Sequence, residues 1–290
     1  MRKNSIAQIV VCALALLVLL AILVGGIWWG QNGFRGWDFG NFLFSFGGST
    51  YSDPGSYSIG SASVEAGDVE NLKINWVGGS VRVEPSSDSK IHITEAKEYK
   101  EDEQLRWKVS GGTLTIQYCK SGLRITDTLR KDLVVAVPET LLESFGELNI
   151  DSVSAGIDIS GGAYRKINLD NGSGRVKVTD CTAGELDMDT VSGNLDFAGV
   201  VHSVSFNSVS ADCELDLTET PREVDADTVS GNVTLRLPQD ASFTAKVDSV
   251  SGDVSTDFNV TREKKRYVCG DGRNEFELDS VSGDMRIQMR

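Results

Sequence analysis

The sequence is poor in the residues that most often carry enzyme chemistry or interrupt regular structure. Histidine occurs twice and proline five times in 290 residues, whereas glycine occurs 30 times. Abundant glycine with little proline is typical of a β-rich protein with many turns, not of a proline-rich disordered chain. The length is sufficient for one large domain or two small ones.

Sequence motifs for catalysis and cofactor binding are missing as well. Neither His92 nor His202 lies in a pattern typical of nucleophilic catalysis or metal ligation. The paired glycines stand between expected strands, with no helix after them, which argues against phosphate-binding and dinucleotide-binding loops. We therefore expect a protein with no catalytic residues and no cofactor.

Cysteine spacing gives no support to a metal site or a disulfide framework. The five cysteines are widely separated and form no CxxC pair: Cys12, Cys119, Cys181, Cys213 and Cys269. We expect the last four to be free thiols that pack as small apolar side chains, with disulfides as the alternative.

Positive charge is scarce, because 28 Lys and Arg face 42 Asp and Glu and leave a net charge of −14. Nucleic-acid affinity depends on cations that neutralise phosphates, so this balance excludes nucleic acid as a partner. The same balance disfavours broad adhesion to anionic lipid and is compatible with cations or cationic partners.

One long apolar run is present, at residues 6–29, and only Gln8 interrupts it. Roughly 20 apolar residues span a bilayer as a helix. Two basic residues before the run place residues 1–5 in the cytoplasm. A cleaved signal peptide is the alternative, but its apolar region is shorter and ends in small residues, whereas this run ends in two tryptophans. We predict an uncleaved signal anchor at 6–29 in the cell membrane, with the C-terminal domain extracytoplasmic.

The next segment, residues 30–56, mixes aromatic residues with glycine and serine. We interpret it as a juxtamembrane linker whose rings rest among the lipid headgroups. A contact surface for another membrane protein is the alternative. The aromatic residues include Phe34, Trp37, Phe39, Phe42, Phe44 and Phe46.

The strongest pattern is an internal repeat in the C-terminal half of the chain. Successive copies begin 19, 19, 18, 20, 21 and 31 residues apart, and an insertion at 259–272 accounts for the last step. Apolar residues recur two positions apart before and after each start, so one face of each strand points inward. A tract of the form D-[ST]-V-S-G begins at Asp151, Asp170, Asp189, Asn207, Asp227, Asp248 and Asp279.

Repeats this short must stack, because one unit cannot bury its own apolar face. Either an antiparallel meander or a parallel β-solenoid would satisfy this need. A serine followed by Ala or Gly stands at the same place in every copy, which favours coils stacked in register. We expect the serine hydroxyls to hydrogen-bond along the column and the Ala or Gly to leave room for the bend. The serines are Ser154, Ser173, Ser192, Ser210, Ser230, Ser251 and Ser282.

The region 57–147 lacks the full repeat but contains further strand patterns. Residues 74–83 resemble a degenerate first coil, and 114–116 and 133–138 are short apolar runs. Terminal repeats differ from the others because they must cap an open end. We predict an all-β parallel β-solenoid of roughly 20-residue, two-strand coils over 57–290, preceded by one transmembrane helix.

These features together resemble a known family. GGSVRVEP at 78–85, VAVP at 135–138, the serial D-[ST]-V-S-G tracts and GDG at 270–272 are similar to the bacterial β-strand-repeat family labelled "putative adhesin", whose function is unknown. The resemblance covers most of residues 60–290. It implies a role in the cell envelope, in adhesion or envelope-stress sensing, and supplies no catalytic residues. The copy at Asp170 departs from the pattern, because Gly172 replaces the valine.

The first residues of the copies form an expected acidic column on the outer surface. Like charges on adjacent strands repel one another, so something must offset them. In one interpretation each Asp accepts hydrogen bonds from backbone N–H groups of the following turn; in the other, the Asp residues bind a row of Ca²⁺ ions. The Ca²⁺ candidates are Asp151, Asp170, Asp189, Asp227, Asp248 and Asp279, and Asp187, Asp225 and Glu277 share their face.

The insertion at 259–272 is the one clear break in the repeat, and it carries a basic cluster. Basic side chains on an acidic rod are candidates for docking a partner, because loops commonly carry function. The alternative is a solvated hairpin tip. The docking candidates are Arg262, Lys264, Lys265 and Arg266.

The sequence favours a non-enzymatic, membrane-anchored binding or scaffold protein of the bacterial cell envelope. Its expected partners are the cytoplasmic membrane, through the N-terminal helix, and another envelope membrane protein or a cell-wall component. The alternative is a carbohydrate-active β-solenoid enzyme acting on cell-wall glycan. Paired carboxylates perform that chemistry, but here acidic residues recur in every coil instead of gathering in one cleft.

Overall fold

The computed structural model describes residues 50–126 and 128–290. Contacts divide the chain into two units, Met1–Phe39 and Gly40–Arg290, and only the second contains described residues. Within the described residues, no helix is long and apolar enough to cross a membrane. Several predictions lie outside the described residues: the tail at 1–5, the signal anchor at 6–29, Cys12 and the aromatic part of 30–56.

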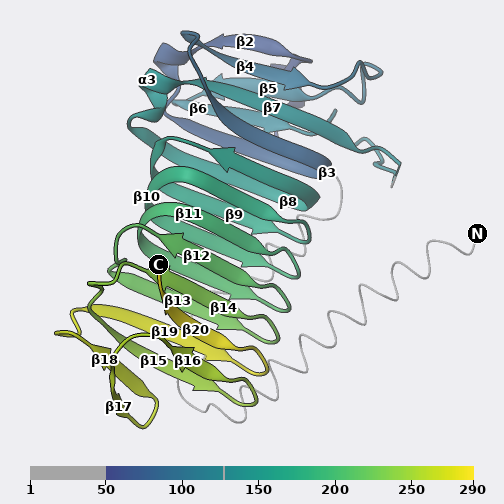
Figure 1. Cartoon of the computed structure of the whole chain (residues 1–290). Helices are drawn as coiled ribbons and strands as arrows, with labels where there is room; N and C mark the ends of the chain where they lie inside the picture. The colour runs from purple at the N-terminus through teal and green to yellow at the C-terminus, as the bar shows by residue number, and fades with distance from the viewer. Residues whose placement is uncertain (1–49, 127) are drawn as a thin grey trace, which may run out of the picture. The chain divides into compact units, whose positions relative to one another are not determined.

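The described chain is a β-solenoid in which parallel strands of successive coils pair side by side (Figure 1). Residues that lie opposite each other on adjacent strands are one repeat apart in the sequence: Val176 lies opposite Leu195, and Leu186 lies opposite Val204. These offsets of 19 and 18 residues equal the repeat length. The predicted all-β solenoid of roughly 20-residue coils is therefore confirmed, and the antiparallel meander is excluded for the repeats.

Each regular coil contributes one strand to each of two sides, which we call side A and side B. Side A carries the repeat starts. In spatial order it contains β1 (Ser58–Ile59), β5 (Arg106–Ser110), β6 (Thr113–Gln117), the first parts of β3 (Asn71–Ser86) and β8 (Phe145–Ser160), β9 (Ala163–Asn171), the second parts of β10 (Val176–Thr190) and β11 (Leu195–Ser208), β13 (Glu223–Thr228), β19 (Asn274–Ser280), β15 (Phe243–Ser249), β18 (Arg266–Cys269) and β17 (Thr261–Glu263).

Side B contains the other parts of the four long strands and seven shorter strands. Its shorter strands are β2 (Ala62–Glu65), β4 (Lys90–Glu95), β7 (Lys131–Pro138), β12 (Cys213–Leu217), β14 (Val233–Leu237), β20 (Met285–Met289) and β16 (Val254–Thr256). The helical elements are short: α3 spans Glu139–Leu142, and 3-10 turns span Pro54–Ser56 and Ala66–Asp68.

The coils do not stack in sequence order at either end. β3 pairs with β8 on one edge and with β6 and β7 on the other, so the coil formed by β6 and β7 lies outside it. Residues 74–83 therefore belong to the second coil, where the sequence predicted the first. At the other end, β19 lies between β13 and β15, and β20 lies between β14 and β16 (Figure 1). The last repeat in sequence thus occupies the penultimate place in the stack.

A ladder of hydrogen bonds from backbone N–H groups to side-chain oxygens follows the same order. The N–H of Asn232 donates to Asp212 Oδ1 at 2.8 Å, and the N–H of Asp284 donates to Asn232 Oδ1 at 3.0 Å. The N–H of Asp253 then donates to Asp284 Oδ1 at 3.0 Å. The repeat that contains Asp284 is thereby bonded on both of its edges, between the repeats that contain Asn232 and Asp253.

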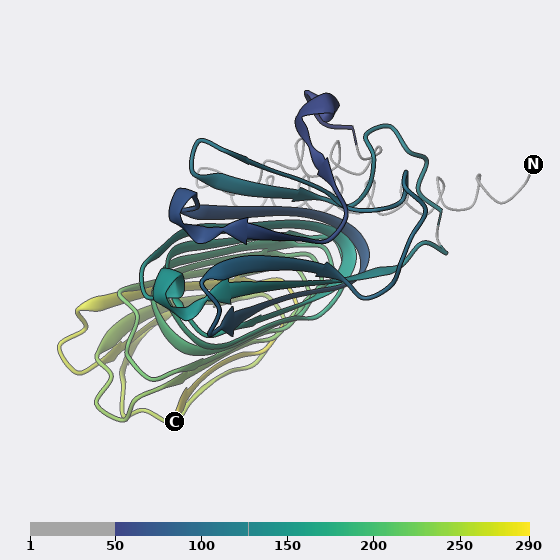
Figure 2. The same cartoon turned by 90° about the horizontal axis from the view of Figure 1, so that it is seen from above.

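Antiparallel strands cover both sides of the N-terminal end of the stack and side A of its C-terminal end. At the N-terminal end, β4 pairs with β7 and β2 with β4, while β5 pairs with β6 and β1 with β5 (Figure 2). At the C-terminal end, the insertion forms the β17–β18 hairpin, which pairs with β15. Covering a sheet edge in this way limits its pairing with other chains. The atypical ends predicted for a solenoid are therefore present.

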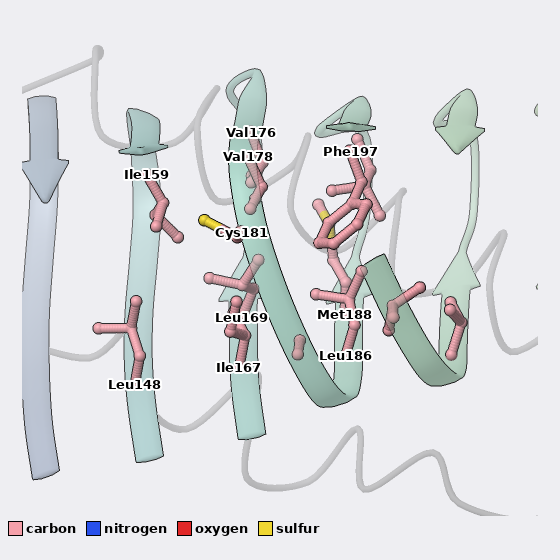
Figure 3. Close-up of a cluster of buried hydrophobic side chains, with 14 of the residues drawn as sticks. Leu148, Ile159, Ile167, Leu169, Val176, Val178, Cys181, Leu186, Met188 and Phe197 are labelled. Carbon is pink, nitrogen blue, oxygen red and sulfur yellow. The ribbon is translucent and has the colours of Figure 1, made fainter. Parts of the chain in front are cut away.

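The core lies between sides A and B and consists of apolar side chains stacked in columns (Figure 3). Leu148, Ile167 and Leu186 form one column on side A, because they pair across adjacent strands. Cys213 occupies a core column between Leu195 and Val233 and is 1% exposed. Cys181, Cys213 and Cys269 are free and buried, which confirms the prediction of packed thiols for these three, and Cys119 is buried as well.

The sharp turn after each repeat start is held by the second residue of the repeat, not by the first. In five coils its hydroxyl accepts a hydrogen bond from the N–H three residues later, at 2.7–3.0 Å. The interpretation that the Asp side chains hold these turns is therefore wrong. Most of these hydroxyls are buried, so each also provides a hydrogen-bond partner for a backbone N–H group inside the stack. They belong to Ser152, Thr190, Thr228, Ser249 and Ser280.

The predicted serine column lies at the turns between side A and side B, where its members form hydrogen bonds to neighbouring coils. Ser154 Oγ donates to the carbonyl of Val77 at 3.1 Å, and Ser251 Oγ donates to the carbonyl of Val281 at 3.2 Å. These bonds run along the column as expected, but their acceptors are backbone carbonyls, not other serine hydroxyls.

The small residue after each serine is required by the close approach of adjacent coils. A Cβ atom at Gly283 would lie 1.8 Å from the carbonyl oxygen of Gly231, well inside contact distance. We expect Gly283→Ala to lower the free energy of unfolding by about 2–3 kcal/mol, because the coils must move apart. Urea denaturation measures this change. Gly156→Ala is the control, since its Cβ would meet nothing closer than 3.9 Å; an equal cost at both positions would contradict the explanation.

Candidate functional site: the acidic side and the C-terminal hairpin

The repeat starts line up in one half-buried column on side A, as predicted. Neighbouring groups offset the charge at three points. Lys73 Nζ lies 3.2 Å from Asp151, Asn207 Nδ2 donates to Asp189 at 2.9 Å, and Lys265 forms an ion pair with Asp248. In spatial order the column is Asp151, Asp170, Asp189, Asn207, Asp227, Asp279 and Asp248.

Elsewhere in the column, burial raises the pKa of the carboxyl groups toward neutral pH, which favours their uncharged form. Burial, together with the carboxylates of Asp151 and Asp189, raises the pKa of Asp170 to about 7. Burial likewise raises the pKa of Asp227 to about 7 and that of Asp279 to about 6. Within the described residues, no three His, Cys, Asp or Glu side chains are arranged to hold a metal ion.

The column makes stability depend on pH. The pKa of Asp227 in the folded state lies above its unfolded value of about 3.9, so this group favours folding below pH 4 and loses that contribution as pH rises through 7. We expect Asp227→Asn to raise the free energy of unfolding by about 1–2 kcal/mol at pH 8, after allowance for partial solvent exposure, and to change it little at pH 4. Urea denaturation at both pH values measures this. The exposed Asp240, changed to Asn, should show no such difference.

Acidic side chains also face one another beside the column. On the outer face of side A, Asp225 lies opposite Glu277, and Glu223 lies opposite Glu275, on the adjacent strands β13 and β19. Like charges directly opposite each other destabilise a sheet. Burial raises the pKa of Asp225, and the neighbouring Glu277 raises it further.

A groove of about 480 Å³ opens where these strands meet β15 and the β17–β18 hairpin. Strands β13 and β19 contribute the four carboxylates of Glu223, Asp225, Glu275 and Glu277. Strand β15 and the hairpin contribute the cations of Lys246, Lys265 and Arg266, together with the carboxylate of Glu263. The groove is therefore the place where the insertion brings positive charge to the acidic side.

The four predicted docking residues separate in the structure. Lys265 and Arg266 line the groove. Arg262 instead lies over the ring of Tyr267 at 5.0 Å, and Lys264 stands at the exposed tip of the hairpin with φ of 55°. A basic cluster that is continuous in sequence thus contributes two of its members to the groove.

Lys246, Glu223 and Glu275 are groove residues that sequence reasoning did not identify. Lys246 occupies the same place before its repeat start as Asp225 and Glu277, so the alternation could have placed it on their face. No pattern in the sequence predicted that β19 would lie between β13 and β15. It brings Glu275 beside Glu223, although the two residues are 52 positions apart.

Three solved structures are similar to the chain over most of its length. A "putative adhesin" from Bacteroides fragilis is 14% identical, with a TM-score of 0.47, over 80% of this chain and 97% of that one. A "putative cell adhesion protein" from Clostridium sporogenes is 12% identical, with a TM-score of 0.39, over 81% and 100%. A "putative lipid binding protein" from Parabacteroides distasonis is 15% identical, with a TM-score of 0.38, over 81% and 97%.

Sequence comparison identifies the family. No curated protein matches the chain. The model of the family described as Toastrack DUF4097 matches twice, at residues 69–203 and 144–288. The two matches overlap and together cover nearly all of the solenoid, in agreement with the resemblance seen in the repeat. The chain belongs to the Toastrack DUF4097 family.

Proposed function

We propose that this chain is a membrane-anchored binding protein of the bacterial cell envelope, which binds its partner at the groove between side A and the β17–β18 hairpin. The observation that carries the proposal is the position of the insertion. The one segment that breaks the repeat supplies Lys265 and Arg266 to the groove that opens on the acidic side. Insertions on a rigid scaffold commonly carry function.

The anchor and the location rest on the N-terminal sequence. The apolar run at 6–29 is long enough to span a bilayer, and the positive charges before it favour a cytoplasmic N-terminus. The solenoid then lies outside the cytoplasm, where another envelope membrane protein or a cell-wall component is within its reach. Its net negative charge disfavours nucleic acid.

Co-purification from native membranes tests this proposal. We compare the tagged full chain, its Arg266→Glu variant, its Lys264→Glu variant and a fragment truncated after residue 56. We expect a partner that is retained by the full chain and by Lys264→Glu, and lost with Arg266→Glu. The two variants change charge equally on one hairpin, but only Arg266 lines the groove. A partner held equally by the fragment would move the binding site to the anchor and its aromatic segment and contradict the proposal.

A carbohydrate-active enzyme is the second candidate, and the Asp225–Glu277 pair is the observation that favours it. Burial and the second carboxylate raise the pKa of Asp225, which favours its acid form, and a pair of carboxyl groups is the arrangement used to hydrolyse glycosidic bonds. Incubation with cell-wall glycan distinguishes the candidates. Sugar release that Asp225→Asn abolishes would support the enzyme, and release of no sugar by the full chain would exclude it for these polymers.

A further inference from the structure

Along the solenoid axis, the groove places two acidic residues beside two basic ones. Across the adjacent strands of side A, Asp225 on β13 lies opposite Glu277 on β19, and Glu277 lies opposite Lys246 on β15. Lys246 in turn lies opposite Arg266 on β18. The row therefore reads acid, acid, base, base, and Glu263 on β17 lies opposite Arg266 at its far end. Lys246 forms an ion pair with Glu277 at the centre of the row.

Each half of this row contains a repulsion that the ion pair does not remove. Asp225 faces Glu277, and Arg266 faces Lys246; pairs of like charge directly opposite each other destabilise a sheet. Arg266 has no ion-pair partner among the residues that the structure describes. An external cation at the acidic half and an external anion at the basic half would relieve both repulsions.

Ligands of a single charge sign fit the groove poorly. A purely cationic ligand would meet Lys246, Lys265 and Arg266, whereas a purely anionic ligand would meet the four carboxylates of β13 and β19 and that of Glu263. Adjacent strands lie about 4.8 Å apart, and β18 is two strands from β19, so the acidic and basic halves are about 5–10 Å apart. A volume of about 480 Å³ is within the range of small-ligand sites.

We propose that the groove binds a dipolar ligand, which carries an amine and a phosphate or carboxylate group about 5–10 Å apart. The amine lies between Asp225 and Glu277, and the anionic group lies between Lys246 and Arg266; these two positions are two strand spacings, about 10 Å, apart. This inference rests on the proposed binding function, because it names the ligand class of the same groove. The chemistry occurs both in lipid headgroups and in soluble amino compounds, and the experiment separates these sources.

Titration calorimetry on the full chain in a non-ionic detergent tests the ligand class. The dipolar probes are 6-aminohexanoate and glycerophosphoethanolamine, and the single-charge probes are hexylamine, hexanoate and inorganic phosphate. We expect a dipolar probe to bind at least tenfold more tightly than any single-charge probe. Arg266→Glu should remove this advantage, while Lys264→Glu on the same hairpin should keep it. Equal binding of single-charge and dipolar probes, or an equal effect of both variants, would overturn the inference.

A second comparison identifies the source of the ligand. Short-chain phosphatidylethanolamine carries the headgroup of glycerophosphoethanolamine together with acyl chains. Tighter binding of the acylated form would support a lipid source, and equal binding would support a soluble or polymer-bound source.

The outcomes also separate this inference from the proposed function. If a membrane partner depends on Arg266 but no dipolar probe binds, the ligand class is wrong and the binding role remains. If neither the partner nor any probe depends on Arg266, the groove itself is not the binding site.

Discussion

Replacing Lys131 by methionine is expected to lower the free energy of unfolding by about 3–5 kcal/mol, the cost of leaving a buried charge without its partner. The Lys131 side chain is 0% exposed, and that of its partner Glu95 is 4% exposed. Lys131 Nζ lies 2.5 Å from Glu95 Oε1 and donates to the carbonyl of Glu103 at 2.7 Å and to that of Tyr118. Removing the amine would leave the carboxylate and two buried carbonyls without this donor.

The surroundings of Lys131 explain why the charge is retained. Burial lowers the pKa of the amine, and the hydrogen bond and charge of Glu95 oppose that shift. The rings of Trp76 and Tyr118 also face the amine, with their centroids 5.0 and 4.5 Å away, at distances where aromatic faces attract cations. Lys131 thus joins the start of β7 to the loops that close the N-terminal end of the stack.

Urea denaturation of the full chain measures the effect of Lys131→Met. The control is Lys120→Met, because Lys120 forms an ion pair with Asp102 at 2.9 Å while both side chains are 55% exposed. Exposed pairs contribute about 0–1 kcal/mol. The double variant Lys131→Met with Glu95→Leu should recover part of the loss, since no unpaired carboxylate remains. A Lys131→Met cost no larger than that of the control would show that the buried pair does not hold this end together.

Truncation after residue 258 is expected to release the coil that precedes the cut. β15 pairs only with β18 and β19, and β16 pairs only with β20, among the described strands. All three partners lie beyond residue 258. In a solenoid stacked in sequence order the same cut would remove the last coil and leave its neighbour docked. Here residues 243–256 lose all their strand pairing at once.

Hydrogen exchange and limited proteolysis measure this release. We expect amide protection in residues 243–256 to fall at least a hundredfold, and proteolysis to trim the truncated chain back to about residue 237. A chain truncated after residue 237 should resist proteolysis as well as the trimmed product does. Retained protection in 243–256 would contradict the expectation. It would mean that this coil moves into the place beside β13 and β14, where the repeat of Asp279 normally lies.

Local patterns in the sequence were sufficient to predict the architecture of the repeats. Alternation with period two determines which side chains point inward, because it depends only on strand geometry. The Ser and Gly or Ala columns then favour parallel stacking, since identical residues recur only if every coil has one orientation. The burial of Cys213 followed from the same alignment. Each of these inferences concerns residues within one repeat or at one repeat spacing.

The turn contacts needed the three-dimensional structure. Asp at the repeat start is a common turn residue and repeats visibly, so it was a reasonable candidate for the turn bond. The second residue varies among Ser, Thr and Asn, as at Ser152, Thr190 and Asn171, and this variation hid its common role. Only the hydrogen bonds of the folded chain show which of the two adjacent polar residues holds the turn.

The sequence by itself determined the strand period, the inward-facing residues, the parallel coils and the family. Only the tertiary structure decided the order of the coils at the two ends, and with it the groove. The physical reason is that the tract DSVSGD is identical at Asp248 and Asp279, so its local interactions suit either place in the stack. The choice depends on the whole chain, through the β17–β18 hairpin that covers β15 and the return of β19 beside β13.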